Sequence, residues 1–282
     1  MIVFNNHFYL MFNNLRVEIS FKDFDQLIKK LDFCLNKKIY KINIPCKGNI
    51  KKDFLLEVVK FIGVKYKNLD VIYHYSLYHQ YQYNKDLSYQ NFLNFLEVNE
   101  TYNKSNEILL VSGSKKRNEF DVLNILKKLK SDFSKNMKFG VAFNPYFFEE
   151  IDYKIERSRL IDKLQYYFVQ SIWLQYGSEL NHLAREINFL NQMILNSQKF
   201  IDNEIKIYGS LFIPSKQFLA RFKFRPWRGV YLSNKYLNSL DESNRITEKI
   251  INFYFNNSII PLLETELSTE KQFIEARKFI DL

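Results

Sequence analysis

The sequence alternates eight times between a short β-branched or aromatic run and a longer stretch whose apolar residues have helical spacing. Each short run predicts a strand, and each longer stretch predicts the helix after it. The expected strands span residues 16–20, 39–44, 69–76, 107–112, 138–143, 167–173, 205–209 and 259–264. Because each helix returns the chain to the same end of the sheet, the strands are expected to be parallel. Eight such pairs predict an α/β fold, a single (β/α)8 TIM barrel over residues 1–282 with residues 1–14 as an N-terminal extension.

An open doubly wound sheet is the alternative α/β fold. It would carry a glycine-rich dinucleotide-binding turn after its first strand. This chain has Ser20-Phe21-Lys22-Asp23 at that place, with no glycine. The sequence also has no GxxxxGK[ST] phosphate-binding loop, so it favours the closed barrel.

The composition is that of an ordinary globular protein, with 46% hydrophobic and 26% charged residues. No run approaches the roughly 20 apolar residues of a membrane helix. Met1–Leu15 lacks the basic start and the small-residue cleavage site of a signal peptide. We therefore expect a cytoplasmic protein without a membrane partner. Cys34 and Cys46 are too few for a disulfide scaffold and are expected to be small buried side chains.

The chain is basic, with 41 Lys and Arg against 31 Asp and Glu and a formal net charge of +10. Such a balance can attract nucleic acid, a phosphate-bearing cofactor or a polyglutamate tail. However, the basic clusters Lys115-Lys116-Arg117 and Lys127-Lys128 are short, and Lys, Asn, Ile, Phe and Tyr are all frequent, as in proteins from AT-rich genomes. We therefore expect no nucleic-acid partner, and the sequence leaves homo-oligomerisation open.

Functional residues of a barrel of this class gather at the carboxyl ends of the strands and in the loops after them. Glu18 lies between Val17 and Ile19 in the first expected strand. If its carboxyl group faces the lumen, burial favours the protonated form, which could serve as a general acid near neutral pH. The alternative is a lumen glutamate paired with a neighbouring lysine or arginine as a structural group. His74, in the third strand, is either functional or a hydrogen-bonded core residue.

Other small or polar residues fall at the same ends of the expected strands. They are Ser20, Asn43, Ser76, Ser112, Gly113, Ser114, Asn144, Gln170, Ser171, Glu264 and Glu266. No HExxH, CxxC or comparable cluster has metal-ligand spacing, so we expect no metal site. No GxSxG elbow is present to indicate nucleophilic hydrolysis.

The order of these segments resembles the methylenetetrahydrofolate reductase family, thinly but from about Leu15 to Ile280. The family opens with a strand similar to S-F-E-F-F-P-P, and Glu18 matches its glutamate. The family's third strand ends like P-H-L-T-C, and His74 of Tyr73-His74-Tyr75-Ser76 matches the histidine. Its fourth strand ends in A-L-R-G-D, where this chain reads Leu110-Val111-Ser112-Gly113-Ser114.

Later segments continue the resemblance. Phe139–Tyr146 follows the family's I-G-V-A-x-Y-P-E closely, with Asn144 in the tyrosine position. Arg159-Leu160-Ile161-Asp162 resembles the family's L-K-R-K-V-D-A-G-A helix. Val169–Trp173 resembles I-T-Q-F-F, whose glutamine falls on Ser171, or on Gln170 if the alignment shifts by one.

The resemblance implies an oxidoreductase that reduces 5,10-methylenetetrahydrofolate to 5-methyltetrahydrofolate with NAD(P)H through FAD. It implies that Glu18 is the catalytic acid and that Gln170 or Ser171 contacts the substrate. The cofactor contacts that it implies are His74, Ser112, Gly113, Ser114, Asn144 and Arg159. The alternative is a divergent barrel that has lost flavin chemistry and binds a folate or a partner protein. It is motivated by Ser112, Ser114 and Leu160, which replace the family's arginine, aspartate and lysine.

Overall fold

The strands of the computed structural model form a closed, parallel barrel in chain order, which confirms the predicted (β/α)8 fold. The structure describes residues 15–48, 50, 52–112, 120–132, 137–196 and 204–280, so the expected N-terminal extension, 1–14, lies outside the described residues. The strands are β1 (Arg16–Glu18), β2 (Lys41–Ile44), β3 (Asp70–Ser76), β4 (Glu107–Val111), β5 (Lys138–Phe143), β6 (Val169–Leu174), β7 (Lys206–Leu211) and β8 (Ile260–Leu263).

The helices fall between the strands where the apolar spacing predicts them. They are α2 (Phe24–Asn36), α3 (Lys52–Lys65), α4 (Leu77–Gln80), α5 (Lys85–Tyr102), α6 (Val122–Asp132), α7 (Glu150–Leu164), α8 (Leu180–Leu195), α10 (Lys216–Phe224), α11 (Asn234–Asn238), α12 (Leu240–Asn256) and α13 (Glu270–Arg277). Polar side chains begin several of them: Asp23, Asn84 and Ser215 each accept a hydrogen bond from a backbone N–H of the first turn. Such caps satisfy donors that a helix leaves without an internal partner. The helices α4, α10 and α11 were not expected.

The chain contacts divide into two compact units, which are described separately. The amino-terminal unit consists of Glu18–Val141 and Ile161–Val169. The carboxy-terminal unit consists of Met1–Val17, Ala142–Leu160 and Gln170–Leu282. Each unit therefore combines segments that are far apart in the sequence.

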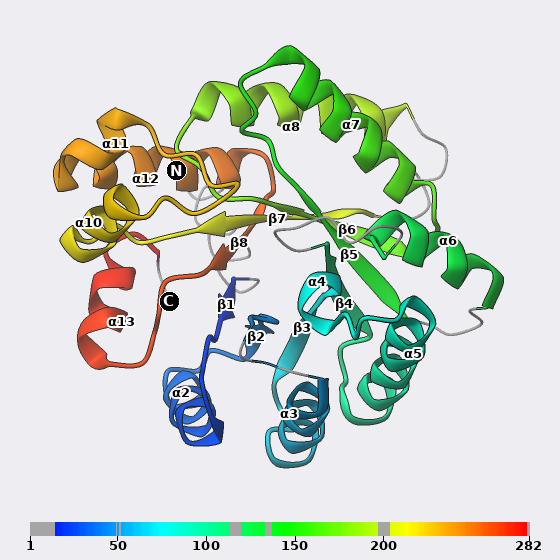
Figure 1. The fold of residues 1–282 in the computed structure, drawn as a ribbon. Coiled ribbons are helices and arrows are strands. Elements are labelled where there is room, and N and C mark those ends of the chain that lie inside the picture. The colour runs from blue at the N-terminus through cyan, green and yellow to red at the C-terminus, as the bar shows by residue number, and fades with distance from the viewer. Residues whose placement is uncertain are drawn as a thin grey trace. The chain divides into compact units, whose positions relative to one another are not determined.

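In the amino-terminal unit, helices lie outside the strands (Figure 1), and aromatic side chains join the two layers. Tyr75 of β3 packs against Phe92 and Phe95 of α5, with ring centroids 4.8 and 4.9 Å apart. Tyr75 therefore points outwards. Because successive side chains of a strand point to opposite faces, His74 points to the inner face.

The two cysteines are buried and form no disulfide, as the sequence predicts. Burial raises the pKa of the Cys34 thiol to about 12, so this thiol stays protonated at neutral pH. Cys46 Sγ accepts a hydrogen bond of 3.1 Å from Nε2 of Gln80. Both residues belong to the packed interior.

In the carboxy-terminal unit, Gly209 shows which face of β7 is covered by a helix. A Cβ atom at this glycine would lie 2.4 Å from the ring of Tyr254 in α12. The neighbouring Tyr208 therefore points to the inner face, where it stacks on Trp173 with a centroid distance of 3.9 Å. The hydroxyl group of Tyr254 donates a hydrogen bond to the carbonyl of Ser210, 2.9 Å away. Burial raises the pKa of Tyr254 far above its usual range, which keeps this donor protonated.

Candidate functional site

A buried carboxylate lies at the carboxyl end of the first strand. Glu18 is the last residue of β1 and is only 9% exposed. Its side chain contacts residues that follow or belong to β1, β2 and β3, and we call this group the Glu18 cluster. Its members are Glu18, Ser20, Asn43, Lys47 and His74. All five lie in the amino-terminal unit.

Lys47 is the nearest cation to Glu18 and comes from the loop after β2. Its Nζ atom lies 3.1 Å from Oε1 of Glu18 and also donates to Oγ of Ser20. The Lys47 side chain is 55% exposed, so its ammonium group approaches the carboxylate from the solvent side. The sequence offered a lysine or arginine partner as the structural alternative for Glu18, but it did not identify Lys47.

His74 lies on the other side of the carboxylate. Its Nδ1 atom is 3.9 Å from Oε2 of Glu18, which is too long for a hydrogen bond. Its Nε2 atom is 2.9 Å from the amide nitrogen of Asn43, and both side chains are buried. Because an amide NH2 group can only donate, Nε2 accepts in this arrangement and the ring proton is on Nδ1, facing Glu18.

The register of the sheet brings these residues together. Asn43 pairs with Ile72 across β2 and β3, and His74 follows two residues later on the same face of β3. Diagonal neighbours of this kind are within reach of long side chains. The polar residues at these strand ends, which the sequence placed as separate candidates, are therefore neighbours in the structure.

The Glu18 cluster has the parts of a proton-transfer site. One carboxylate oxygen of Glu18 faces the half-exposed ammonium group of Lys47. The other faces Nδ1–H of His74 at a distance too long for a hydrogen bond. A ligand nitrogen or oxygen that enters between them could exchange a proton with Glu18, and His74 would then stabilise the carboxylate. Asn43 acts on this chemistry only through the orientation of His74.

The remaining expected cofactor contacts that the structure describes do not belong to one unit. Ser112 follows β4 and is half-buried, while Gly113 and Ser114 lie outside the described residues. Arg159 is on α7, 46% exposed, with its Nη1 atom 3.9 Å from Oε2 of Glu156. Of the two described residues, Ser112 belongs to the amino-terminal unit and Arg159 to the carboxy-terminal unit.

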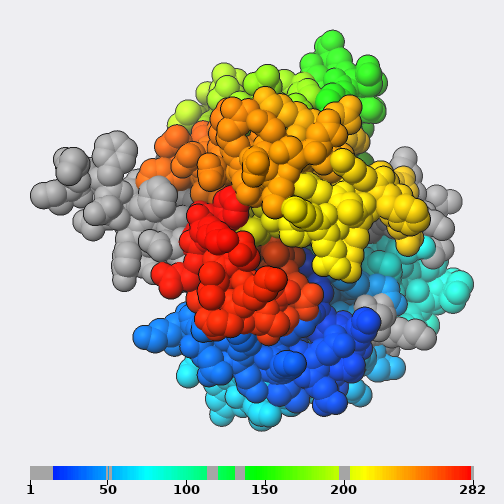
Figure 2. Space-filling view, turned by 90° about the vertical axis from the view of Figure 1, so that its left-hand side faces the viewer, coloured from blue at the N-terminus to red at the C-terminus, as the bar shows by residue number. Residues whose placement is uncertain are grey.

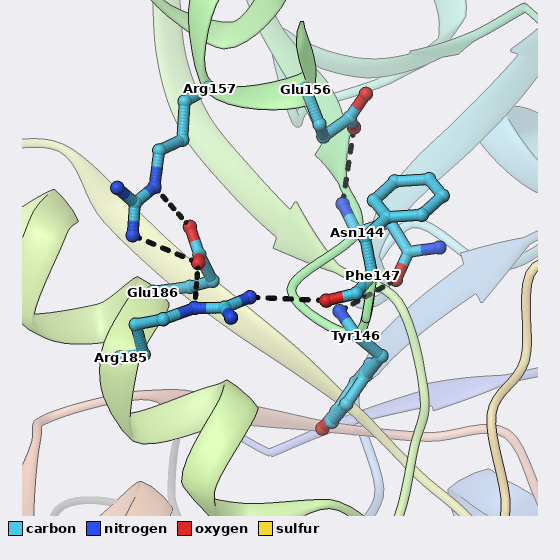
Figure 3. Close-up of polar contacts among 7 residues, drawn as sticks. All are labelled: Asn144, Tyr146, Phe147, Glu156, Arg157, Arg185 and Glu186. Carbon is cyan, nitrogen blue, oxygen red and sulfur yellow. Dashed lines mark hydrogen bonds and ion pairs between the residues drawn. The ribbon is translucent and has the colours of Figure 1, made fainter. Parts of the chain in front are cut away.

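Asn144 organises the loop after β5 in the carboxy-terminal unit. Its side-chain amide donates to the carbonyl of Gly229 at 3.1 Å, and its Oδ1 atom accepts from the backbone N–H of Tyr146. Its own backbone N–H donates to Oε1 of Glu156 (Figure 3). The polar groups of Asn144 therefore hold the loop and the chain around Gly229.

The sequence did not predict a second buried carboxylate, Glu186 of α8, which Figure 3 also shows. Its oxygens accept from Nε and Nη2 of Arg157 at 2.7 and 3.0 Å, and from Nε of Arg185 at 2.6 Å. Arg185 also donates to the carbonyl of Phe147 in the loop after β5. This group fastens α7, α8 and that loop together. The only signal in the sequence was the presence of acidic and basic residues in helices of ordinary appearance.

The two alternatives for the substrate contact in β6 face opposite ways. Ser171 shares the inner face with Trp173, and its Oγ atom accepts a hydrogen bond of 2.8 Å from the indole N–H of Trp173. Gln170 therefore points to the outer face. Of the two residues, Ser171 is the one directed into the barrel.

The described residues do not fit a flavin phosphate site. The guanidinium group of Arg159 is at the surface with Glu156, the amide of Asn144 holds Gly229, and the ring of His74 is held by Asn43. A phosphate needs several converging donors, as in a nest of backbone N–H groups or a guanidinium fork. Arg159, Asn144 and His74 do not form such a set.

The described part of the chain has neither a metal-binding cluster nor a membrane-spanning helix. No group of three or more His, Cys, Asp or Glu residues there could hold a metal ion. No helix there is both long enough and apolar enough to cross a membrane.

Comparison with known proteins gives likeness in fold and none in sequence. No protein-family model matches the chain, and no curated protein matches its sequence. A solved structure from Clostridium thermocellum, an uncharacterized protein that binds two copies of 5-methyl-5,6,7,8-tetrahydrofolic acid, is similar with a TM-score of 0.60. The match has 12% identity and covers 96% of each chain. An NADPH complex of an aldo-keto reductase from Klebsiella pneumoniae gives a TM-score of 0.48, with 8% identity over 95% of this chain and 86% of that one.

At these identities the comparisons show the barrel fold alone. The fold places ligand chemistry at the carboxyl ends of the strands, where the Glu18 cluster lies. The function has to be argued from that cluster.

Proposed function

We propose that this protein binds a reduced folate at the carboxyl end of its barrel, with Glu18 as the group that exchanges a proton with the ligand. The observation that carries the proposal is the buried Glu18 carboxylate between Lys47 and His74. The resemblance of Glu18 and His74 to the reductase family's glutamate and histidine supports it. The Clostridium thermocellum protein with a similar fold, which binds a methylated tetrahydrofolate, also supports it.

The finer proposal is that the protein reduces 5,10-methylenetetrahydrofolate to 5-methyltetrahydrofolate. Glu18 would first take up a proton from solvent and then pass it to a folate nitrogen, which would open the five-membered ring and leave an electrophilic iminium. NAD(P)H would supply the hydride that reduces the iminium and would leave as NAD(P)+. Lys47 would then neutralise the carboxylate that remains on Glu18. Because the described residues do not fit a flavin, no step is assigned to FAD.

The second candidate is a barrel that binds a folate or a partner protein without redox chemistry. The surface position of Arg159 beside Glu156 and the hydrogen bond from Asn144 to Gly229 favour it, since these are residues on which cofactor binding would depend. Absorbance of the purified protein at about 450 nm tests for bound flavin. A colourless protein that cannot be loaded with FAD and does not oxidise NAD(P)H in the presence of the folate would favour this candidate.

Calorimetric titration with 5-methyltetrahydrofolate tests folate binding directly. We expect the unmodified protein to bind and Glu18→Gln to weaken binding by about tenfold or more, since a charge-assisted contact contributes about 1.5–3 kcal/mol. Glu248→Gln, an exposed change on α12, is the matched control and should leave the affinity unchanged. Absence of binding by the unmodified protein, or equal affinities in all three proteins, would contradict the proposal.

Turnover distinguishes the two candidates. If the chain is a reductase, it oxidises NAD(P)H only when methylenetetrahydrofolate is present, and Glu18→Gln abolishes this oxidation. Folate binding without any such oxidation would leave the binding function and exclude the reductase reaction.

A further inference from the structure

One segment of the carboxy-terminal unit is basic without any acidic residue. No Asp or Glu occurs between Glu204 and Asp241. The cations of this interval are Lys206, Lys216, Arg221, Lys223, Arg225, Arg228 and Lys235. Most of them lie on α10 and in the irregular chain that follows it. We call residues 216–228 the α10 ridge.

The cations of the ridge are exposed, and so are two of its aromatic rings. Arg221, Lys223 and Arg225 are exposed, and none of the three forms an ion pair in the described part of the chain. Phe224 lies between two of them and is 92% exposed. In Figure 2 the ridge occupies part of the face turned to the viewer, in yellow. Phe224, with the partly exposed Trp227, places open aromatic rings among cations, a combination that suits a ligand with both apolar and anionic groups.

The second ring, Trp227, is fixed in place by other aromatic residues. It is 41% exposed, and its ring lies 5.3 Å from Phe212, 5.6 Å from Phe218 and 5.9 Å from Phe222. The helix before it begins at a cap, Ser215, whose hydroxyl group accepts from the N–H of Phe218. Trp227 is therefore a rigid, partly open aromatic surface beside the cations.

The buried face of α10 argues against an anionic membrane as the ligand. A helix that lies in a bilayer surface inserts a continuous apolar face. The apolar residues Leu219 and Phe222 of α10 are buried in the protein, which leaves Phe224 alone to insert. Alternating cations and open aromatic rings are the pattern of surfaces that bind single-stranded nucleic acid, because bases stack on the rings and phosphates pair with the cations.

We propose that the α10 ridge binds single-stranded nucleic acid. Bases stack on Phe224 and Trp227, and phosphates pair with Arg221, Lys223 and Arg225. The proposal is independent of the folate function. It departs from the expectation drawn from the sequence, which depended on the shortness of the consecutive cation runs and on a composition like that of proteins from AT-rich genomes. In the ridge, apolar residues separate the cations, so the sequence shows no run of consecutive cations there. The surface is cationic because the intervening Phe222 is buried while Arg221 and Lys223 are exposed.

Fluorescence anisotropy of a labelled oligothymidylate of about 15 nucleotides tests the charged part of the proposal. We expect the triple variant Arg221→Glu, Lys223→Glu, Arg225→Glu to bind at least about tenfold more weakly than the unmodified protein. The control triple variant Lys29→Glu, Lys60→Glu, Lys130→Glu changes the net charge equally at exposed positions of the amino-terminal unit. It should lose at most about twofold, since its cations are not at the binding surface.

The salt dependence provides a second readout. Each phosphate contact to a single strand contributes a slope of about −0.7 in a plot of log affinity against log salt. The ridge variant should therefore have a slope shallower by roughly two, and the control variant should keep the original slope.

The aromatic part is tested by Phe224→Ser, with Tyr83→Ser as the control because Tyr83 is similarly exposed. Stacking contributes about 1–3 kcal/mol per base, so Phe224→Ser should weaken oligothymidylate binding by about fivefold or more. It should not change binding of an abasic strand of the same length. Tyr83→Ser should change neither.

Three results would overturn the proposal. The first is equal loss of affinity in the ridge and control triple variants. The second is no effect of Phe224→Ser on oligothymidylate binding. The third is binding of phosphatidylserine vesicles that depends on Phe224, with no binding of the oligonucleotide. Circular dichroism and urea unfolding of each variant verify that the barrel is intact.

Discussion

Two buried glutamates show how differently the same carboxylate can be held. Glu186 is 1% exposed, and both of its oxygens are within 3.0 Å of arginine nitrogens. Glu18 is 9% exposed, with one oxygen 3.1 Å from a lysine and the other 3.9 Å from a histidine. The first is a closed ion-pair network, and the second is a carboxylate with room for another partner.

The cations explain the difference. A guanidinium group is planar and binds a carboxylate through two parallel N–H bonds, which fixes the geometry. The arginines of the Glu186 network are also held over rings, with Arg185 3.9 Å from the centroid of Tyr153 and Arg157 4.5 Å from that of Phe189. Lys47 is a single point charge on a flexible, half-exposed stem. A ligand can displace Lys47 far more easily than it can displace either arginine.

Loss of Glu186 should therefore have the largest effect on stability. We expect Glu186→Ala to lower the free energy of unfolding by about 3 kcal/mol, because two arginines lose a buried partner. Urea unfolding followed by circular dichroism measures the change. Glu248→Ala, at an exposed position of α12, is the control. A change below about 1 kcal/mol would mean that the network does not fasten α7 to α8.

Asn43→Leu should have an intermediate effect, since it removes a buried hydrogen bond to His74. We expect a loss of about 1–2 kcal/mol in the free energy of unfolding. The ring proton of His74 should also lose its preference for Nδ1, which nitrogen correlation spectra of histidine-labelled protein detect. If the tautomer of His74 in the unmodified protein were already Nε2–H, Asn43 would not be its positioning residue.

Of these three variants of buried residues, Glu18→Gln should lower the free energy of unfolding least and weaken folate binding most. Because the Lys47 side chain is half-exposed, the Glu18–Lys47 pair resembles a surface ion pair, and the expected loss is below about 1 kcal/mol. Urea unfolding and folate titration of the same sample measure both effects. A loss of stability as large as that of Glu186→Ala would place Glu18 among structural ion pairs.

The smallest expected effect is a pH dependence beside the Glu186 network. Burial, and then the charge of Arg185, lower the pKa of His182 below its usual value. The unfolded chain therefore binds a proton at this residue more readily, so stability should fall as the pH drops through about 6.5. His182→Gln should reduce the fall between pH 7.5 and 5 in thermal melts. A steeper fall in the variant would contradict the sign of this effect.

The fold followed from the sequence because barrel strands must be buried on both faces. Alternation of short apolar runs with helical spacing therefore placed every strand to within two residues at each end. The helices α4, α10 and α11 escaped prediction, since elements of four to nine residues carry little periodic signal.

The site was predictable only in part. Glu18, Asn43 and His74 were candidates because strand ends of parallel sheets meet at one rim. Lys47 was not, because a loop lysine has no pattern that indicates its partner. Arg159 and Ser112 were expected from their places in a motif, but a motif does not tell where a side chain points when its neighbours have changed.

The contrast between the two tryptophans has a practical consequence. Trp173 is buried, stacked on Tyr208 and hydrogen-bonded to Ser171, whereas Trp227 is partly open to water. The fluorescence of Trp173 should consequently form a blue component that iodide does not quench. The fluorescence of Trp227 should form a red component that iodide quenches. A ligand on the surface near Trp227 would alter only the red component, while melting of the strands would alter both. The unlabelled protein thus contains an optical reporter for each event.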